Sequence, residues 1–291
     1  MLRLIFRFIA ILPLPITYLL AWPIGGLLYV LRNNQRHIAE VNIALCYPEL
    51  DVKAQAAMCR RSMVETVKNM FDSVKIWMAR DRGIFHLVKT VTNESLLLDA
   101  LEQKRGVLLL LPHLGNWELV CSYVSSKHAV TGLYRPQKSS ELDKIILEGR
   151  QVFGGIAVPA SKLGVRRLLK ALRDNQLLLI LPDQNPGKGT GQFVPFYSIQ
   201  TNTPVLPARL AQKTGAVVIT AYAKRLPYAR GYDIKFAAAR PQLMDADMEI
   251  ALTAMNADIE DKVRCDPTQY WWGYSRFRHR PPGEPSLYKK D

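Results

Sequence analysis

Residues 106–118 read Gly-Val-Leu-Leu-Leu-Leu-Pro-His-Leu-Gly-Asn-Trp-Glu, and this stretch decides the fold. Its unbroken aliphatic run is typical of a strand buried on both faces, as strands of parallel sheets are. Pro112 ends the run, Gly115 permits a tight turn, and Asn116 is a favourable N-cap for the amphipathic helix that follows. A strand, a turn and a helix in this order predict one repeat of a parallel α/β sheet.

Short apolar runs alternate with helical periodicities from residue 88 onward. The expected strands are 106–111, 130–134, 176–181, 216–223 and 232–237. The expected helices are 95–103, 117–126, 141–152, 164–175, 204–214 and 247–264, preceded by a helical region at 37–80 that includes a long helix at 52–78. This alternation predicts the α/β fold class, with a mostly parallel central sheet flanked by helices.

The composition limits the classes of function. With 48% hydrophobic residues, the 291-residue chain carries too many aliphatic side chains for a disordered protein. Its net charge of +14 indicates an acidic partner: nucleic acid, an anionic membrane surface, an acidic carrier protein or a phosphorylated substrate. Charge alone does not choose among these partners.

The four cysteines are scattered and form no Cys-x-x-Cys pair. This spacing argues against a disulfide framework and against a structural zinc site, and it favours a reducing cytoplasmic setting. Cys121 lies three residues after Glu118, which raises the question of a nucleophilic thiol. A small buried residue on a helix is the favoured interpretation of Cys121.

The segment from Phe8 to Leu31 contains no charged residue. About 20 apolar residues are enough to cross the hydrocarbon core, so the segment predicts a membrane anchor. Prolines at positions 13, 15 and 23 make one straight helix improbable, which leaves a kinked span or a half-inserted interfacial helix. A cleaved signal peptide is disfavoured, because its apolar core is shorter and no small-residue cleavage site follows.

His113 follows the central strand directly, and Glu118 lies in the first turn of the next helix. In open α/β sheets, ligands bind at this carboxyl edge. A carboxylate that holds the imidazole through Nδ1–H leaves Nε2 free to remove a proton from a hydroxyl. The competing interpretation is structural: Glu118 complements the helix dipole and His113 caps the turn. The spacing alone leaves both open.

The chain resembles the late acyltransferases of lipid A biosynthesis, the lauroyl and myristoyl transferase branch of the His-x4-Asp/Glu acyltransferases. The resemblance covers nearly the whole chain. It is carried by His113 to Glu118, Leu133 to Pro136, Pro182 to Gln184 with the loop after it, Thr203 to Pro207, and the aromatic and basic tail Gln269 to Pro281.

The resemblance implies a glycerolphosphate-acyltransferase-like fold without cofactor or metal. It implies transfer of a fatty acyl group from an acyl carrier protein to a hydroxyl of a Kdo-bearing lipid A precursor. His113 is then the general base and Glu118 its partner. The expected substrate-binding residues are Asn116, Arg135, Arg150, Asp183, Gln184 and Arg276.

We therefore expect residues 1–31 to form a membrane anchor and residues 32–291 the acyltransferase domain. The strongly basic remainder of the chain favours a cytoplasmic body, so the protein is expected at the cell inner membrane with the catalytic domain facing the cytoplasm, and without a nucleic-acid partner. For each single arginine, a solvated surface role weighs as much as a ligand contact. Asp183 either shapes the acceptor pocket or caps its loop.

Three other functions remain open from the residues. One is an acyltransferase for another acceptor, such as a different glycolipid or a lysophospholipid. A second is a non-enzymatic basic protein that binds a membrane or nucleic acid, for which the tail at 270–280 has part of the signature. The third is a hydrolase, which is disfavoured because Ser122, Ser125 and Ser126 lack a nucleophile elbow.

Overall fold

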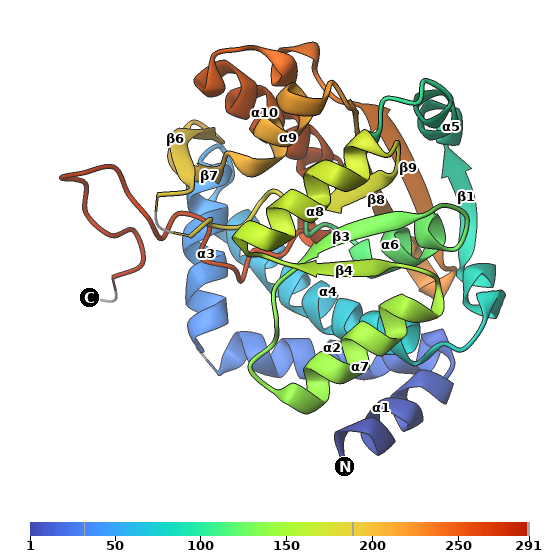
Figure 1. Ribbon diagram of the computed structural model, residues 1–291. Helices are drawn as coiled ribbons and strands as arrows, with labels where there is room; N and C mark the ends of the chain where they lie inside the picture. Colours follow the sequence, from blue (N-terminus) through green and yellow to red (C-terminus); the bar gives the residue numbers. More distant parts are fainter. Residues whose placement is uncertain (32, 188, 290–291) are drawn as a thin grey trace. The chain divides into compact units, whose positions relative to one another are not determined.

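The computed structural model describes residues 1–31, 33–187 and 189–289 (Figure 1). The first residue of the expected acyltransferase domain, Arg32, lies outside the described residues, as do the last two of the chain. Contacts divide the chain into two compact units, which are described separately. The first unit comprises Met1–Thr17, Asn69–Leu181 and Leu210–Ala238, and the second Tyr18–Lys68, Pro182–Arg209 and Ala239–Asp291.

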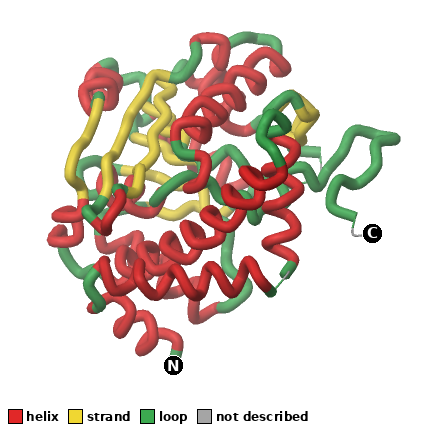
Figure 2. Tube along the Cα trace, turned by 180° about the vertical axis from the view of Figure 1, so that it is seen from behind, coloured by secondary structure: helices red, strands yellow, loops and turns green. Residues whose placement is uncertain are grey.

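The first unit contains a seven-stranded sheet, whose strands lie side by side in Figure 2. The strand order is β1 (Val88–Thr92), β9 (Tyr232–Ala238), β8 (Val217–Arg225), β2 (Val107–Leu110), β5 (Leu177–Ile180), β3 (Val130–Tyr134) and β4 (Ile156–Pro159). The run from β8 to β4 is parallel, whereas β9 is antiparallel to β8 and β1 runs parallel to β9. The predicted α/β class with a mostly parallel sheet is confirmed. The edge strands β1 and β4 were not anticipated.

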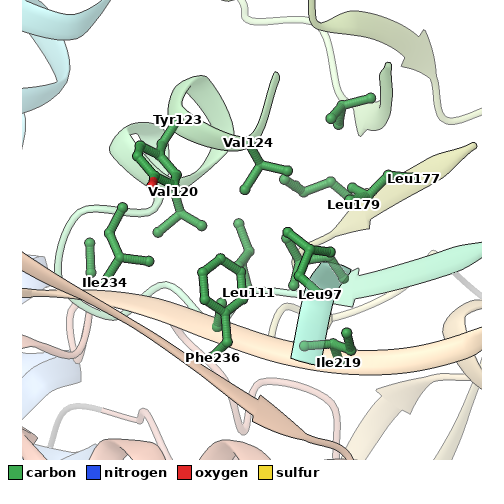
Figure 3. Close-up of a cluster of buried hydrophobic side chains, with 14 of the residues drawn as sticks. Leu97, Leu111, Val120, Tyr123, Val124, Leu177, Leu179, Ile219, Ile234 and Phe236 are labelled. Atoms are coloured by element: carbon green, nitrogen blue, oxygen red, sulfur yellow. The ribbon is translucent and has the colours of Figure 1, made fainter. Parts of the chain in front are cut away.

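Helices of the first unit pack on this sheet. They include α5 (Glu94–Glu102), α6 (Trp117–Ser125), α7 (Ser140–Val152) and α8 (Lys162–Arg173). Figure 3 shows Val120, Tyr123 and Val124 of α6 in the cluster that also holds Leu111 of the chain after β2 and Phe236 of β9. Residues 107–111 are at most 1% exposed, so both faces of β2 are covered. This burial explains the unbroken leucine run.

The second unit is built around a hairpin of β6 (Gly191–Phe196) and β7 (Ile199–Pro204). The two-residue turn places Tyr197 and Ser198 at φ of 50° and 66°, which is the pattern of a type I′ turn. Because such φ values strain residues other than glycine, the turn needs support. The backbone N–H of Tyr197 donates to Glu260 Oε1 at 2.8 Å from α10 (Met248–Cys265), which packs on β6.

The remaining elements complete the two units. The helices are α3 (Asn34–Cys46), α4 (Val52–Met78) and α9 (Leu206–Thr214), and short 3₁₀ segments cover Arg82–Leu87, Pro227–Ala229, Pro241–Met244 and Pro267–Gln269. The expected helices at 52–78, 95–103, 117–126, 141–152, 164–175, 204–214 and 247–264 are all present, with ends shifted by at most two residues. From Tyr270 to Lys289 the chain is mostly loop and turn (green in Figure 2).

The amino-terminal apolar segment forms two helices, α1 (Leu2–Ile11) and α2 (Leu14–Val30). No single helix among the described residues is long and apolar enough to cross a membrane, and only α1 and α2 taken together reach that length, with a bend of 119° between them. The predicted membrane-anchoring helix is therefore not confirmed, whereas the predicted interruption of the segment is present between Ile11 and Leu14. Pro13 lacks a backbone donor, and Lys75 Nζ donates to the final carbonyls of α1, at 3.2 Å for Ile9 and 3.3 Å for Ala10.

A buried ion pair joins α4 to the carboxyl end of β8. Arg225 donates from Nε and Nη2 to Asp72 Oδ2 at 2.9 and 2.7 Å, and both side chains are at most 3% exposed. Two charges removed from water are tolerated only as a pair, so loss of one partner leaves the other uncompensated.

We predict that Arg225→Met lowers the free energy of unfolding by about 3–5 kcal/mol, because Asp72 stays buried without its cation. Urea denaturation measures the change. The control is Arg230→Met, which removes an exposed arginine from the same unit and shifts the value by no more than about 0.5 kcal/mol. Equal effects of the two substitutions would contradict a buried-pair role.

Candidate active site

The loop between β2 and α6 is tied to the sheet on both sides. Leu111 N donates to Ile180 O of β5 at 3.0 Å, and Asn116 N donates to Ala223 O of β8 at 3.0 Å. Gly115 bridges to Ala223 with a φ of +59°, a conformation that glycine adopts without strain. The loop is thus fixed at the carboxyl edge of the parallel strands.

Asn116 begins α6. Its Oδ1 accepts from Leu119 N at 3.0 Å, which confirms the predicted N-cap. The residue is 1% exposed, and within the described part of the chain its Nδ2 has no hydrogen-bond partner. The cap is a property of the fold. Its expected contact with substrate stays a prediction.

Glu118 lies in the first turn of α6 and is 2% exposed. Arg150 of α7 holds both carboxylate oxygens: Nε donates to Oε2 at 3.0 Å, and Nη2 donates to Oε1. Burial alone raises the pKa of Glu118, but the charge and hydrogen bonds of Arg150 outweigh burial, and Trp77 and His113 act in the same direction. The net pKa of Glu118 is therefore lowered, and the carboxylate is ionised.

Arg150 is fixed by more than its partner. Its guanidinium carbon lies 5.8 Å from the centre of the Tyr134 ring at the end of β3. Burial lowers the pKa of Arg150, and the neighbouring Glu118 carboxylate raises it by more. Arg150 thus lies in the candidate site, where it contacts Glu118. Its predicted contact with substrate stays a prediction.

His113 is half-buried on the same loop, with its ring centre 4.8 Å from that of Trp117 at 65°. Because His113 contributes to the lowered pKa of Glu118, its ring lies within electrostatic range of the carboxylate. The geometry therefore brings together a partly accessible imidazole, a buried ionised carboxylate and a locked arginine.

Trp77 and Gly149 are site residues that the sequence did not reveal. A Cβ on Gly149 would lie 2.5 Å from Trp77 Cα and 2.6 Å from Trp77 O, so α7 meets α4 backbone to backbone. This contact places Arg150, the next residue, against Glu118. Trp77 lies on α4, far from the His113–Glu118 motif in sequence. The one available signal was that Gly149, a residue that allows close helix packing, directly precedes Arg150 in the expected helix 141–152.

Cys121 is a free thiol whose pKa is raised, first by burial and then by the charge of Glu118. A protonated thiol is a poor nucleophile. Cys121 is half-buried and packs against the hydrophobic cluster, so it is a structural residue of the helix that is less buried than expected. Within the described residues, no cluster of three or more His, Cys, Asp or Glu side chains is suited to a metal ion.

The remaining predicted residues divide between the units. Arg135 follows β3 in the first unit and is exposed. Asp183, Gln184 and Arg276 belong to the second unit. Their environment is described there, and no contact with His113 or Glu118 is assigned.

Within the second unit, Arg276 is 2% exposed and braces the hairpin. Its Nη1 donates to Asn202 O at 2.8 Å and its Nη2 to Thr203 Oγ1 at 3.0 Å. Burial lowers the pKa of Arg276, against the charges of Tyr270 and Asp183. Asp183 is itself buried and adds to the raised pKa of Tyr270, which burial causes first. The described contacts of Arg276 are internal, and the predicted substrate role of all three residues remains untested.

Comparison with known proteins places the chain in a family context. The family model described as bacterial lipid A biosynthesis acyltransferase matches residues 2–279. The chain is 27% identical to the lipid A biosynthesis lauroyltransferase of Escherichia coli, over 95% of this chain and 90% of that one. It is 25% identical to the palmitoleoyltransferase of the same organism over the same shares, and 27% identical to a lipid A biosynthesis acyltransferase of Haemophilus influenzae over 98% and 91%.

We predict that Arg150→Met reverses the pH dependence of stability. With Arg150 gone, burial dominates and the pKa of Glu118 rises above its unfolded value of about 4.3. A raised carboxyl pKa means that the folded state binds the proton more tightly, so the free energy of unfolding increases as the pH falls from 8 to 5. In the wild type the pKa of Glu118 is lowered, so the free energy of unfolding does not increase over this pH range. It begins to decrease only when the pH falls below the pKa of Glu118 in the unfolded chain.

Urea denaturation at several pH values tests this, with the double variant Arg150→Met/Glu118→Gln as control. The double variant has no buried carboxyl at this position and is expected to lose the pH dependence. A pH dependence that persists in it must come from another group.

We further predict that Gly149→Ala lowers turnover by up to about 100-fold. A Cβ 2.5 Å from Trp77 Cα would push α7 away from α4 and so move Arg150 away from Glu118. The matched control is Gly26→Ala, also a helical glycine, where a Cβ meets nothing within 4 Å. An active Gly149→Ala enzyme with native stability would show that the close approach of α7 to Trp77 is dispensable.

Proposed function

This chain belongs to the bacterial lipid A biosynthesis acyltransferase family, and from that premise we propose that it transfers a fatty acyl group from an acyl carrier protein to a hydroxyl of a Kdo-bearing lipid A precursor. The observation that carries the proposal is the half-buried His113 beside an ionised, arginine-locked Glu118 at the carboxyl edge of the sheet. This is the edge at which ligands of open α/β sheets bind.

In the proposed reaction, His113 takes the proton from the acceptor hydroxyl as its oxygen attacks the carbonyl carbon of the thioester. A carbon–oxygen bond forms, the carbon–sulfur bond breaks, and the imidazolium returns its proton to the departing thiolate. Glu118 stays ionised throughout because Arg150 holds its pKa low, so it stabilises the imidazolium without taking the proton. The backbone N–H groups at the start of α6 are suited to the developing oxyanion.

We infer that the enzyme supplies no nucleophile of its own. The Cys121 thiol is held protonated, chiefly by burial. Direct attack by the substrate hydroxyl therefore needs only a base, its orienting carboxylate and an oxyanion site.

The donor and acceptor are supported by charge and by the relatives. The relatives' names cite lipid A biosynthesis with lauroyl and palmitoleoyl groups. Phosphates and Kdo carboxylates on the acceptor, and an acidic carrier protein, match a chain with a net charge of +14. Arg135 is exposed and follows the carboxyl end of β3, which supports a role for it in binding such an anion in a bidentate manner.

We place the protein at the inner membrane with the acyltransferase domain, residues 32–291, facing the cytoplasm, and we assign residues 1–31 to membrane contact. Apolar side chains of this segment are strongly exposed, among them Leu4, Phe8 and Ile11 of α1 and Leu19 and Leu27 of α2. Exposed apolar surface of this extent marks a membrane or protein contact. The bend between the helices fits shallow insertion at the interface as well as a broken span.

We predict that His113→Ala and Glu118→Gln each lower turnover by about 10²–10⁴-fold, because the first removes the base and the second the charge that supports it. Mass spectrometry of the Kdo-bearing precursor, incubated with an acyl carrier protein thioester, measures the gain of one acyl chain. Cys121→Ala is the control and is expected to keep wild-type turnover.

Normal turnover in both His113→Ala and Glu118→Gln would end the general-base mechanism. If the wild-type enzyme acylates a lysophospholipid or another glycolipid but not the Kdo-bearing precursor, the proposed acceptor is wrong. A protein that binds membranes and transfers nothing would belong to the non-enzymatic class.

A further inference from the structure

Helix α8 carries an exposed cationic face. Lys162, Arg166, Arg167, Lys170 and Arg173 are all exposed, and the helix has no acidic residue. At about 100° per residue these five side chains fall within an arc of about 140°. The side chains buried against the sheet occupy the opposite side of the helix.

These charges have almost no internal counterpart. Among the described residues, Lys170 pairs with Asp174, and no carboxylate forms an ion pair with the other four cations. Like charges at spacings of four, such as Lys162 with Arg166, lower helix stability. Arg150 and Arg225, by contrast, are each held by a carboxylate. The face of α8 is therefore unfavourable for the isolated fold and suited to an anionic partner.

Leu163 lies within the cationic arc and is 60% exposed. A phosphate or a carboxylate needs no apolar contact at the centre of its cations. An apolar side chain surrounded by charges is instead the arrangement of a protein–protein contact, with an apolar centre and a polar rim. The partner that fits is an acidic protein surface.

The helix begins at the edge of the sheet where the candidate active site lies. Ser161 follows β4 and caps α8 by accepting from Gly164 N at 3.1 Å. A Cβ on Gly164 would come within 1.9 Å of Pro159 O, so the first turn of α8 rests directly on the end of β4.

His113 follows β2 at this same edge. In the order β2-β5-β3-β4 the two strands are three positions apart, about 14 Å at about 4.8 Å per strand. A carrier protein bound at the beginning of α8 is thus close enough for a thioester on a flexible prosthetic arm to reach His113.

We propose that the face of α8 formed by Lys162, Leu163, Arg166, Arg167 and Lys170 is the docking surface for the acidic carrier protein that delivers the acyl group. This inference rests on the proposed function and names the partner surface of that site. A bilayer is the weaker partner, because the exposed apolar side chains of the first unit that we assign to membrane contact lie on α1, which Figure 1 shows apart from α8, with α7 and β4 between them.

The test is the double variant Arg166→Glu/Arg167→Glu in the full-length enzyme. Both positions are exposed, and exposed substitutions change stability little, so the fold is preserved. We expect KM for the acyl carrier protein thioester to rise by about tenfold or more and the affinity for fluorescently labelled carrier protein, measured by anisotropy, to fall in parallel. With an acyl pantetheine thioester as donor, KM is expected to stay unchanged.

Two matched controls separate docking from general charge. Lys104→Glu/Arg105→Glu makes the same charge change at exposed positions before β2, at the opposite edge of the sheet, and is expected to leave both measurements unchanged. Leu163→Ser is expected to weaken carrier binding severalfold without any charge change. Leu98→Ser on α5, which is 44% exposed, is expected to have no effect.

The inference is overturned if Arg166→Glu/Arg167→Glu binds the carrier protein normally, or if both double variants lose affinity equally. It is also overturned if the loss appears instead in KM for the lipid acceptor, or in binding to phosphatidylglycerol vesicles. A wild-type enzyme that binds the carrier protein but transfers nothing from it would defeat the proposed function and leave the docking surface standing.

Discussion

The contact on which the site depends is the bidentate bond between Arg150 and Glu118. A carboxylate that is 2% exposed takes up a proton unless a cation compensates for the lost water, and Arg150 supplies two donors and a full charge. The Arg150–Glu118 ion pair depends in turn on contacts farther from the site. Arg150 reaches Glu118 because Gly149 lets α7 touch the backbone of α4 at Trp77, and Glu118 is in place because the loop is bonded to β8 through Ala223. One ion pair thus couples three helices to the sheet.

The basic residues divide according to their surroundings. Arg150, Arg225 and Arg276 are largely buried and are consumed by carboxylates or by backbone and side-chain oxygens of the fold. Those on α8 are exposed and lack such partners among the described residues, apart from Lys170. A net charge of +14 therefore does not describe one uniform basic surface. The buried arginines hold parts of the fold in position, and the exposed ones attract an anionic partner.

Local sequence patterns predict much of the fold. Short apolar runs predicted β2, β3, β5, β8 and β9. The runs of β2 and β5 are unbroken because both faces of these strands are buried, whereas β9 alternates buried with more exposed residues. The partly exposed edge strands β1 and β4 lack that signal. The β6–β7 hairpin was missed for another reason: its turn uses Tyr197 and Ser198 where Asn-Gly is usual, and it is held by Glu260, 63 residues away along the chain. Long-range support of this kind leaves no local trace.

The sequence by itself determined the α/β class, the strand–turn–helix unit and the spacing of His113 and Glu118. Each strand, turn and helix signal depends on residues within about a dozen positions, and the α/β class follows from the order of these local signals along the chain. It also determined the break in the amino-terminal helix, since proline acts locally. Only the tertiary structure decided that Glu118 is buried and ionised, that Arg150 is its partner, and that Trp77 and Gly149 set their distance. Those facts depend on which helices meet. Burial and charge pairing are properties of residues brought together from distant parts of the chain, which no local spacing encodes.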